Sequence, residues 1–214
     1  MKNFKKIYVL GAGAVGCFFG GMLARAHHDV TLVGRSDRAL AIQDHGLAME
    51  CQTFNETIPI KASNDISLLS DADLILLCVK SHDTEKALKD LAPILPKETV
   101  VLSLQNGVAN VDVASQIISN AVYPAVVYVA CGMVGDRVMK HHGRGELLVG
   151  TVGELSLRDS ENLAGICELF QSAAVPCEIA PQILKDMWLK FLVNCSYNAI
   201  SGIGQIAYGE MVKV

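Results

Sequence analysis

The sequence contains no long uninterrupted hydrophobic run. A helix that crosses a membrane needs roughly 18 or more consecutive apolar residues, and no such stretch occurs, although 51% of the 214 residues are hydrophobic. The N-terminus, MKNFKKIYVLGAG, continues directly into an apolar segment and does not resemble a secretory leader. These absences predict a soluble, cytoplasmic protein whose main partner is not a membrane.

The sequence also has little excess charge. There are 18 basic and 22 acidic residues, the formal net charge is −4 at pH 7, and blocks of like charge, internal repeats and low-complexity segments are all absent. A nucleic-acid-binding domain usually carries a basic patch or stripe. The balance of charge therefore argues against nucleic acid as a partner.

Cysteine and histidine show no metal-binding pattern. The seven cysteines are scattered, odd in number and without C-x-x-C spacing, which is typical of small buried side chains in a reducing compartment. The histidine pairs, 27–28 and 141–142, consist of neighbours that point in different directions on any regular element. We therefore expect no metal site.

Apolar strand-like segments alternate with helix-like segments through most of the chain. This alternation predicts an α/β domain over residues 1–180 with a Rossmann-type, doubly wound parallel sheet. The expected strands are 6–10, 29–33, 73–79, 99–104, 121–131 and 176–179, and the expected helices are 15–26, 36–44, 82–92, 109–119 and 160–173.

Two antiparallel hairpins are expected in addition. Residues 46–60 favour a short hairpin insertion. Residues 137–142 and 146–150, joined by Gly143-Arg144-Gly145, favour an antiparallel hairpin at one edge of the sheet. A long helix over 182–200 and a helix-like start at 211–214 predict that an all-α domain begins at 181 and is mostly absent from this chain.

A glycine-rich turn links the first strand to the first helix. It has the G-x-G-x-x-G pattern, formed by Gly11, Ala12, Gly13, Ala14, Val15 and Gly16. In a strand-turn-helix context, these glycines permit a tight turn, a close approach of pyrophosphate, and close packing of helix on strand. The pattern predicts a dinucleotide site, and the alternative is a glycine-rich turn without a ligand.

Arg35 follows the second strand, where an NAD site usually carries a carboxylate for the ribose 2′-OH. A guanidinium group is suited instead to a 2′-phosphate, with Ser36 and Arg38 as helpers, so NADPH is the expected cofactor. The alternative is a solvated arginine, and the nearby Asp37 keeps this alternative open.

Further candidates follow other strands. Lys80 comes after the apolar segment 74–79, Asn106 and Gly107 come after 100–104, and Gly132 comes after 121–131. Ligands of open parallel sheets lie beyond the carboxyl ends of the strands, which favours a binding role. Strand capping for Lys80 and ordinary turn chemistry for Asn106-Gly107 are the alternatives.

The long helix carries a narrow polar stripe. Asp186, Lys190, Asn194 and Asn198 recur every four residues, and most of the other positions are apolar. Such a stripe is either the solvated face of the helix or an active-site face. In the second case Lys190 supplies charge and a proton to a substrate carbonyl oxygen, and the two amides hold the substrate.

Together these motifs resemble the ketopantoate reductase (2-dehydropantoate 2-reductase) family. The similar segments are Gly11–Gly16, Arg35, Cys78-Val79-Lys80, Leu104-Gln105-Asn106-Gly107, His142 to Gly150, and Trp188 to Asn198. The resemblance implies hydride transfer from NADPH to the ketone of 2-dehydropantoate. It also implies NADPH binding by Gly11–Gly16, Lys80 and Asn106, with Gly132 a looser match, proton donation by Lys190, and substrate binding by Lys190, Asn194 and Asn198.

Two departures from the family pattern keep other functions open. Tyr208 stands where some members carry an asparagine, and the family's acidic residue and serine from a larger helical domain have no counterpart here. The alternatives are a reductase or dehydrogenase of another small 2-oxo or β-hydroxy acid, or an NADPH-binding module without turnover. A homodimer is a further expectation.

Overall fold

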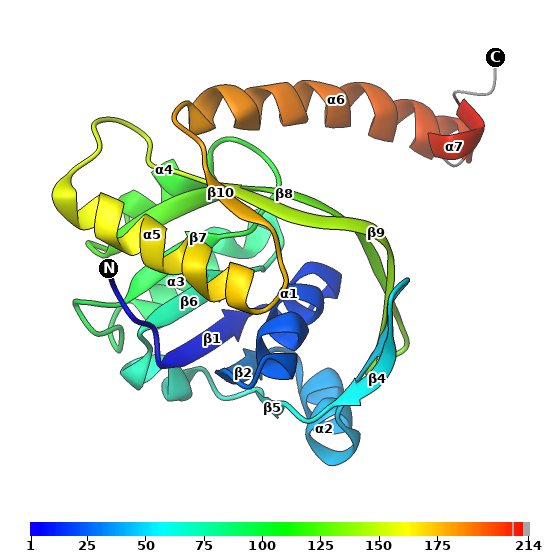
Figure 1. Ribbon diagram of the computed structural model, residues 1–214, viewed down its shortest axis with the longest axis horizontal. Coiled ribbons are helices and arrows are strands. Elements are labelled where there is room, and N and C mark those ends of the chain that lie inside the picture. Colours follow the sequence, from blue (N-terminus) through cyan, green and yellow to red (C-terminus); the bar gives the residue numbers. More distant parts are fainter. Residues whose placement is uncertain (207, 212–214) are drawn as a thin grey trace.

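One ten-stranded mixed sheet forms the centre of the molecule (Figure 1). The computed structural model describes residues 1–206 and 208–211. The strands are β1 (Lys6–Leu10), β2 (Asp29–Val33), β3 (Leu47–Glu50), β4 (Asn55–Ile58), β5 (Lys61–Ser63), β6 (Leu74–Leu77), β7 (Val100–Ser103), β8 (Ala121–Val134), β9 (Val138–Val149) and β10 (Cys177–Ile179).

Six neighbouring strands make the parallel part of this sheet. Their order is β5-β2-β1-β6-β7-β8, and all five pairings between them are parallel. The chain moves outward in one direction from β1 through β2 to β5, and in the other direction from β6 to β8. This is the Rossmann order, with its topological switch point between β1 and β6. The predicted doubly wound sheet is confirmed.

Helices cover the parallel strands on both faces. They are α1 (Ala14–Arg25), α2 (Ser36–His45), α3 (Thr84–Leu91), α4 (Asn110–Ser115), α5 (Leu157–Ser172), α6 (Ile183–Gly204) and α7 (Tyr208–Met211), with two 3-10 helices, η1 (Ile66–Asp71) and η2 (Ser81–Asp83). These positions confirm the expected helices to within a few residues at their ends. Of the helix-like start at 211–214, positions 212–214 lie outside the described residues.

Two apolar layers hold the helices on the sheet. Phe18 and Phe19 of α1 and Phe170 of α5 belong to the larger core on one face. On the other face, Leu88 of α3 packs in a second core together with Leu69 of η1. Strands β6 and β7 are buried along their whole length, which explains why β6 is a continuous apolar run and β7 is apolar up to Ser103.

The expectation of a hairpin over 137–142 and 146–150 is wrong. Residues 138–149 form the single strand β9, which pairs antiparallel with β8 through a turn at 135–137. Gly143, Arg144 and Gly145 lie inside β9, beside register shifts in the β8–β9 pairing. A glycine pair around a polar residue suits a bulge as well as a turn, and here it forms a bulge. The antiparallel hairpin at the sheet edge is β3–β4, as expected for 46–60.

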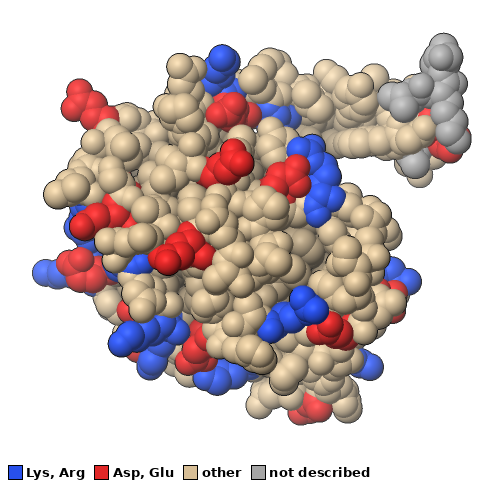
Figure 2. Space-filling model, in the orientation of Figure 1, with Lys and Arg blue, Asp and Glu red and all other residues tan. Residues whose placement is uncertain are grey.

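Helix α6 extends beyond the body of the molecule as an arm (Figure 1). It packs on β8 near its start, where Ile183 and Met187 are buried against Val126. Much of its outward surface is apolar, and in Figure 2 most of the arm carries no charged side chain. The exposed large apolar residues of α6 are Leu184, Trp188, Leu189, Leu192, Val193, Tyr197, Ile200 and Ile203. A domain boundary near 181 remains a prediction.

Candidate functional site

The glycine-rich turn occupies the switch point between β1 and β6. Gly11 has a φ of +112°, and a Cβ there would lie 2.6 to 2.8 Å from backbone atoms of Cys78 and Val79. A Cβ on Gly16 would overlap the Gly11 carbonyl oxygen and approach the Val9 side chain to 2.9 Å. The turn after β1 therefore needs glycine at both positions to pass close to the end of β6 and to bring α1 against β1.

Gly13 differs from these two glycines because its surroundings are open. It is the N-cap of α1, and a Cβ there would meet no heavy atom within 4 Å. The first N–H groups of a helix have no partner inside the helix and favour negative charge. The start of α1 thus presents open backbone donors, as an anion-binding helix terminus does.

A cavity of about 620 Å³ lies over this turn. Its lining comes from the carboxyl ends of β1, β2 and β6 and from the loops that follow them. The residues are Leu10, Gly11, Ala12, Gly13, Val33, Gly34, Arg35, Arg38, Asn64, Ile66, Cys78, Val79, Lys80 and Asp83. The structure therefore gathers the glycine turn, Arg35 and Lys80 at one place, as the sequence predicted.

The two arginines of this cavity have different surroundings. Arg35 is exposed at the end of β2. Arg38 is half-buried and donates hydrogen bonds to the carbonyl oxygens of Ala12, at 2.9 Å, and Gly135, at 3.4 Å. Arg38 thereby holds the glycine turn in place, whereas Arg35 is accessible to a ligand.

Gln105, to which the sequence analysis assigned no role, connects two loops of the site. Its buried amide donates to the Val79 carbonyl oxygen at 2.9 Å and to the Thr84 hydroxyl at 2.7 Å. Its side-chain oxygen accepts a hydrogen bond from Ser103 at 3.0 Å. Gln105 therefore fixes Asn106 relative to Lys80. The signal available in the sequence was a glutamine directly after an apolar strand and beside Asn106.

Lys190 lines a second cavity, of about 690 Å³, between α6 and β8. Its ammonium group donates a hydrogen bond to the Val127 carbonyl oxygen and lies 5.6 Å from the centre of the Tyr128 ring. Burial, with a smaller contribution from the positive charge of Arg144, lowers the pKa of Lys190 from 10.5 to about 8. The lysine can therefore both hold and release a proton near neutral pH.

Three members of the polar stripe line this cavity, with Lys190 and Asn194 half-buried and Asn198 exposed. Lys190, Asn194 and Asn198 line it together with Asn106, and a neighbouring cavity of about 530 Å³ shares the three asparagines. Asp186, the first member of the stripe, is half-buried and lies outside the lining of both. The helix thus presents amides and an ammonium group to the cavity together with the apolar side chains of Leu189 and Val193.

Neighbouring residues of the first turn of α1 line the two main cavities, Gly13 the first and Val15 the second. Ala14 lies between them. Gly132 is half-buried within β8 and belongs to the lining of neither cavity, so its binding role remains a prediction without geometric support. Ala14 and Gly16 also line neither cavity, and the other sequence-predicted residues line one cavity or the other.

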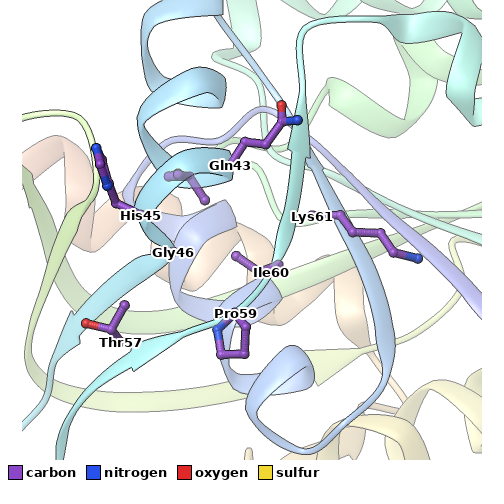
Figure 3. A pocket seen from close by; sticks show the side chains of 8 residues that line it. Gln43, His45, Gly46, Thr57, Pro59, Ile60 and Lys61 are labelled. Atoms are coloured by element: carbon purple, nitrogen blue, oxygen red, sulfur yellow. The ribbon is translucent and has the colours of Figure 1, made fainter.

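A further cavity of about 570 Å³ lies away from these two cavities, between the C-terminal end of α2 and the segment from β4 to β5 (Figure 3). Its lining includes His45, Thr57 and Ile60. The Lys61 ammonium group at its rim is already paired with Asp29 at 2.6 Å. We assign it no role in the chemistry of the site.

Within residues 1–206 and 208–211, no group of three or more His, Cys, Asp or Glu side chains is placed to hold a metal ion. No helix in the described part of the chain is both long and apolar enough to span a membrane.

Fold and site together define a Rossmann-type α/β protein with a glycine-rich turn at the switch point and a lysine-asparagine helix across the adjoining cavity. Residues 7–154 match the family described as Ketopantoate reductase PanE/ApbA. The chain belongs to this family.

Individual relatives agree with this assignment. A 2-dehydropantoate 2-reductase from Pyrococcus horikoshii is 34% identical over 206 residues, covering 96% of this chain and 66% of the relative. The crystal structure of a PanE/ApbA family ketopantoate reductase from Ralstonia eutropha JMP134 is 43% identical with a TM-score of 0.87, covering 98% of this chain and 67% of that one. A ternary complex of D-mandelate dehydrogenase with NADH and anilino(oxo)acetate, at 24% identity and a TM-score of 0.88, covers 98% of this chain and 67% of that one and shows likeness of fold alone.

The chain spans about two thirds of the length of the curated relatives that it matches, 66% and 65% for the two Pyrococcus reductases.

Proposed function

We propose that this chain provides the NADPH site and the proton donor of a reductase that converts 2-dehydropantoate, a small 2-oxo acid, to pantoate. The observation that carries the proposal is the position of Lys190. Its partly buried ammonium group lies across a cavity that adjoins the glycine turn at the start of α1. Membership of the ketopantoate reductase family supports the same reaction.

The residues around the glycine turn fit a dinucleotide. Backbone donors at the start of α1 suit the pyrophosphate, and the open space above Gly13 lets it approach closely. The exposed Arg35 at the end of β2 suits a 2′-phosphate, which favours NADPH over NADH. Bound NADPH supplies the hydride.

Lys190 has the properties of a general acid for this reaction. Reduction of a ketone builds negative charge on the carbonyl oxygen, which a nearby ammonium group stabilises and then protonates. Because burial and Arg144 lower its pKa to about 8, Lys190 gives up its proton more readily than an exposed lysine does. Asn194 and Asn198, one and two helical turns further along α6, hold the polar groups of the substrate.

The proposal is tested by following NADPH oxidation at 340 nm with 2-dehydropantoate, in wild type and in Lys190→Ala. Turnover by the wild type that falls about 10²-fold to 10⁴-fold in Lys190→Ala supports it. Arg158→Gln is a matched control, because Arg158 is an exposed cation on α5 paired with Glu98 at 2.8 Å. NADPH binding without oxidation of NADPH would instead favour a binding module.

Aromatic rings in the same cavity favour an alternative substrate, a 2-oxo acid other than 2-dehydropantoate. Tyr197 and Tyr208 contact each other edge to face, with ring centres 5.6 Å apart, and both line the cavity with Val193 and Leu189. Such a wall suits an apolar or aromatic side chain on the 2-oxo acid. A higher kcat/KM for phenylpyruvate than for 2-dehydropantoate would favour this alternative.

A further inference from the structure

Arg144 has an unusual backbone conformation in the middle of β9. Gly143, Arg144 and Gly145 have φ values of +148°, +60° and +143°, and a non-glycine residue with positive φ is uncommon. The β8–β9 register shifts on either side, between Tyr128 and Val129 and between Ala130 and Cys131. Bulges of this kind redirect a side chain and are frequent beside active sites.

The redirected side chain reaches the cavity of Lys190. The guanidinium carbon of Arg144 lies 4.1 Å from the centre of the Tyr128 ring, and Arg144, Tyr128 and Lys190 all line that cavity. The described residues in the lining thus include two cations and no carboxylate. The cavity therefore favours an anion.

Glu146 holds the guanidinium group from one side only. One carboxylate oxygen of Glu146 accepts a hydrogen bond from Arg144 Nε at 2.7 Å and forms an ion pair with Nη2 at 2.5 Å. The other oxygen accepts a hydrogen bond from the Gly145 N–H at 3.0 Å. A guanidinium group has five N–H donors in a fixed plane. Glu146 therefore fixes the plane of the group, and the Nη1 donors are outside this pairing.

We propose that Arg144 binds the carboxylate of the 2-oxo acid while Lys190 binds the adjacent carbonyl oxygen. The proposal rests on the function proposed above. A 2-oxo acid carries its carboxylate on the carbon next to the ketone, so a site that reduces it benefits from one cation for each group. Arginine suits the carboxylate because its planar donors match the two oxygens, and lysine suits the ketone because it can release its proton.

The first test compares Arg144→Gln with wild type on two substrates, 2-dehydropantoate and its neutral 2-oxo amide. We expect KM for the acid to rise about 10-fold to 100-fold in Arg144→Gln, since charge-assisted hydrogen bonds are lost. We expect KM for the amide, kcat, and the Kd of NADPH to change less than about threefold. Arg158→Gln should leave all four quantities unchanged, because its ion pair with Glu98 is exposed and belongs to neither cavity lining.

A second readout separates a charge effect from a merely structural one. Arg144 is one cause of the lowered pKa of Lys190, so its neutralisation should move the pH profile of kcat to higher pH. The other ionisable groups near the lysine are the phenols of Tyr128, Tyr197 and Tyr208, together with Glu146 beside Arg144, and all remain in the variant. Arg144→Lys should keep the wild-type profile and rescue KM only in part.

Arg144→Gly provides a variant that retains the fold, because glycine accepts the positive φ at this position. It should show the same loss of preference for the acid over the amide. If the wild type reduces the acid but Arg144→Gln and Arg144→Gly keep its KM and the wild-type preference for acid over amide, Arg144 does not bind the carboxylate. If the wild type reduces no 2-oxo acid, the proposed function fails, and this proposal fails with it.

Discussion

The Lys190 ammonium group donates a hydrogen bond to the backbone carbonyl oxygen of Val127, which ties the middle of α6 to β8. This bond turns the lysine toward the sheet although most neighbouring side chains on the helix are apolar. In an ordinary amphipathic surface helix the charged face meets water, whereas here the ammonium group is partly buried against the sheet.

Activity should depend on the protonated form of Lys190. Because its pKa is lowered to about 8, kcat for reduction should be constant at lower pH and should fall about tenfold per pH unit above 8. A pH profile from 6 to 10 with saturating cofactor and substrate measures this. A rate that stays constant to pH 10 would contradict the role of Lys190 as the acid.

Replacing Lys190 with methionine should stabilise the fold at pH 7. The native pKa of about 8 lies below the unfolded value of 10.5, so the unfolded state binds more protons between these pH values, and wild-type stability rises with pH there. The free energy of unfolding of Lys190→Met should therefore exceed that of the wild type by about 2 kcal/mol at pH 7. This difference should become smaller by pH 10. Urea titrations of both proteins at the two pH values measure the difference, and equal stability at pH 7 would contradict it.

Two glycine substitutions in the same turn should have different effects. Gly11→Ala places a Cβ 2.6 Å from the Cys78 backbone at a φ of +112°, so it should lower the unfolding free energy by about 3 kcal/mol or more. Gly13→Ala has open space and should change the melting temperature by less than about 3 °C, yet weaken NADPH binding at least tenfold. Thermal melts and NADPH fluorescence titrations decide this. An unchanged affinity of Gly13→Ala for NADPH would contradict pyrophosphate binding at this position.

Substitutions of the two arginines beside the glycine turn should also have different effects. Arg35→Ala should reduce the preference for NADPH over NADH by about tenfold, because an exposed guanidinium group is lost where the 2′-phosphate would bind. Arg38→Ala should instead lower stability by about 1 to 3 kcal/mol, because it leaves the Ala12 carbonyl oxygen without its 2.9 Å donor. Titration of each variant with NADPH and NADH measures the cofactor preference, and urea unfolding measures the free energy of unfolding. Equal affinity of the wild type for NADH and NADPH would refute the role of Arg35.

Gln105→Ala should loosen the loops that carry Lys80 and Asn106. It removes three hydrogen bonds of 2.7 to 3.0 Å, which should cost about 2 to 3 kcal/mol of stability and raise the Kd of NADPH. Gln116→Ala, at the exposed C-terminal end of α4, is the control and should change neither quantity. If the two variants behave alike, Gln105 does not organise the site.

The parallel strands were predictable because a strand buried on both faces is a nearly continuous apolar run, as β6 and β7 are. The bulge at Gly143–Gly145 was not predictable, because its composition also suits a hairpin turn. Only the pairing of β9 with β8 shows that these residues form a bulge. The polar stripe followed from its spacing of four residues. Which way Lys190 of the stripe points could not be predicted, because it depends on a hydrogen bond to the backbone of Val127, 63 residues away in the chain.

The register of β3 has a consequence for the order in which the sheet is completed. Ala48 lies opposite Val138, 90 positions later in the chain, and β3 joins β9 in parallel. At about 5 to 20 residues per second, a ribosome takes on the order of 5 to 20 s to make the intervening segment. Until β9 is made, the edge of β3 that β9 covers has no partner strand, and an unpaired strand edge is a place where another chain can pair. Completion of this side of the sheet therefore depends on a long-range pairing.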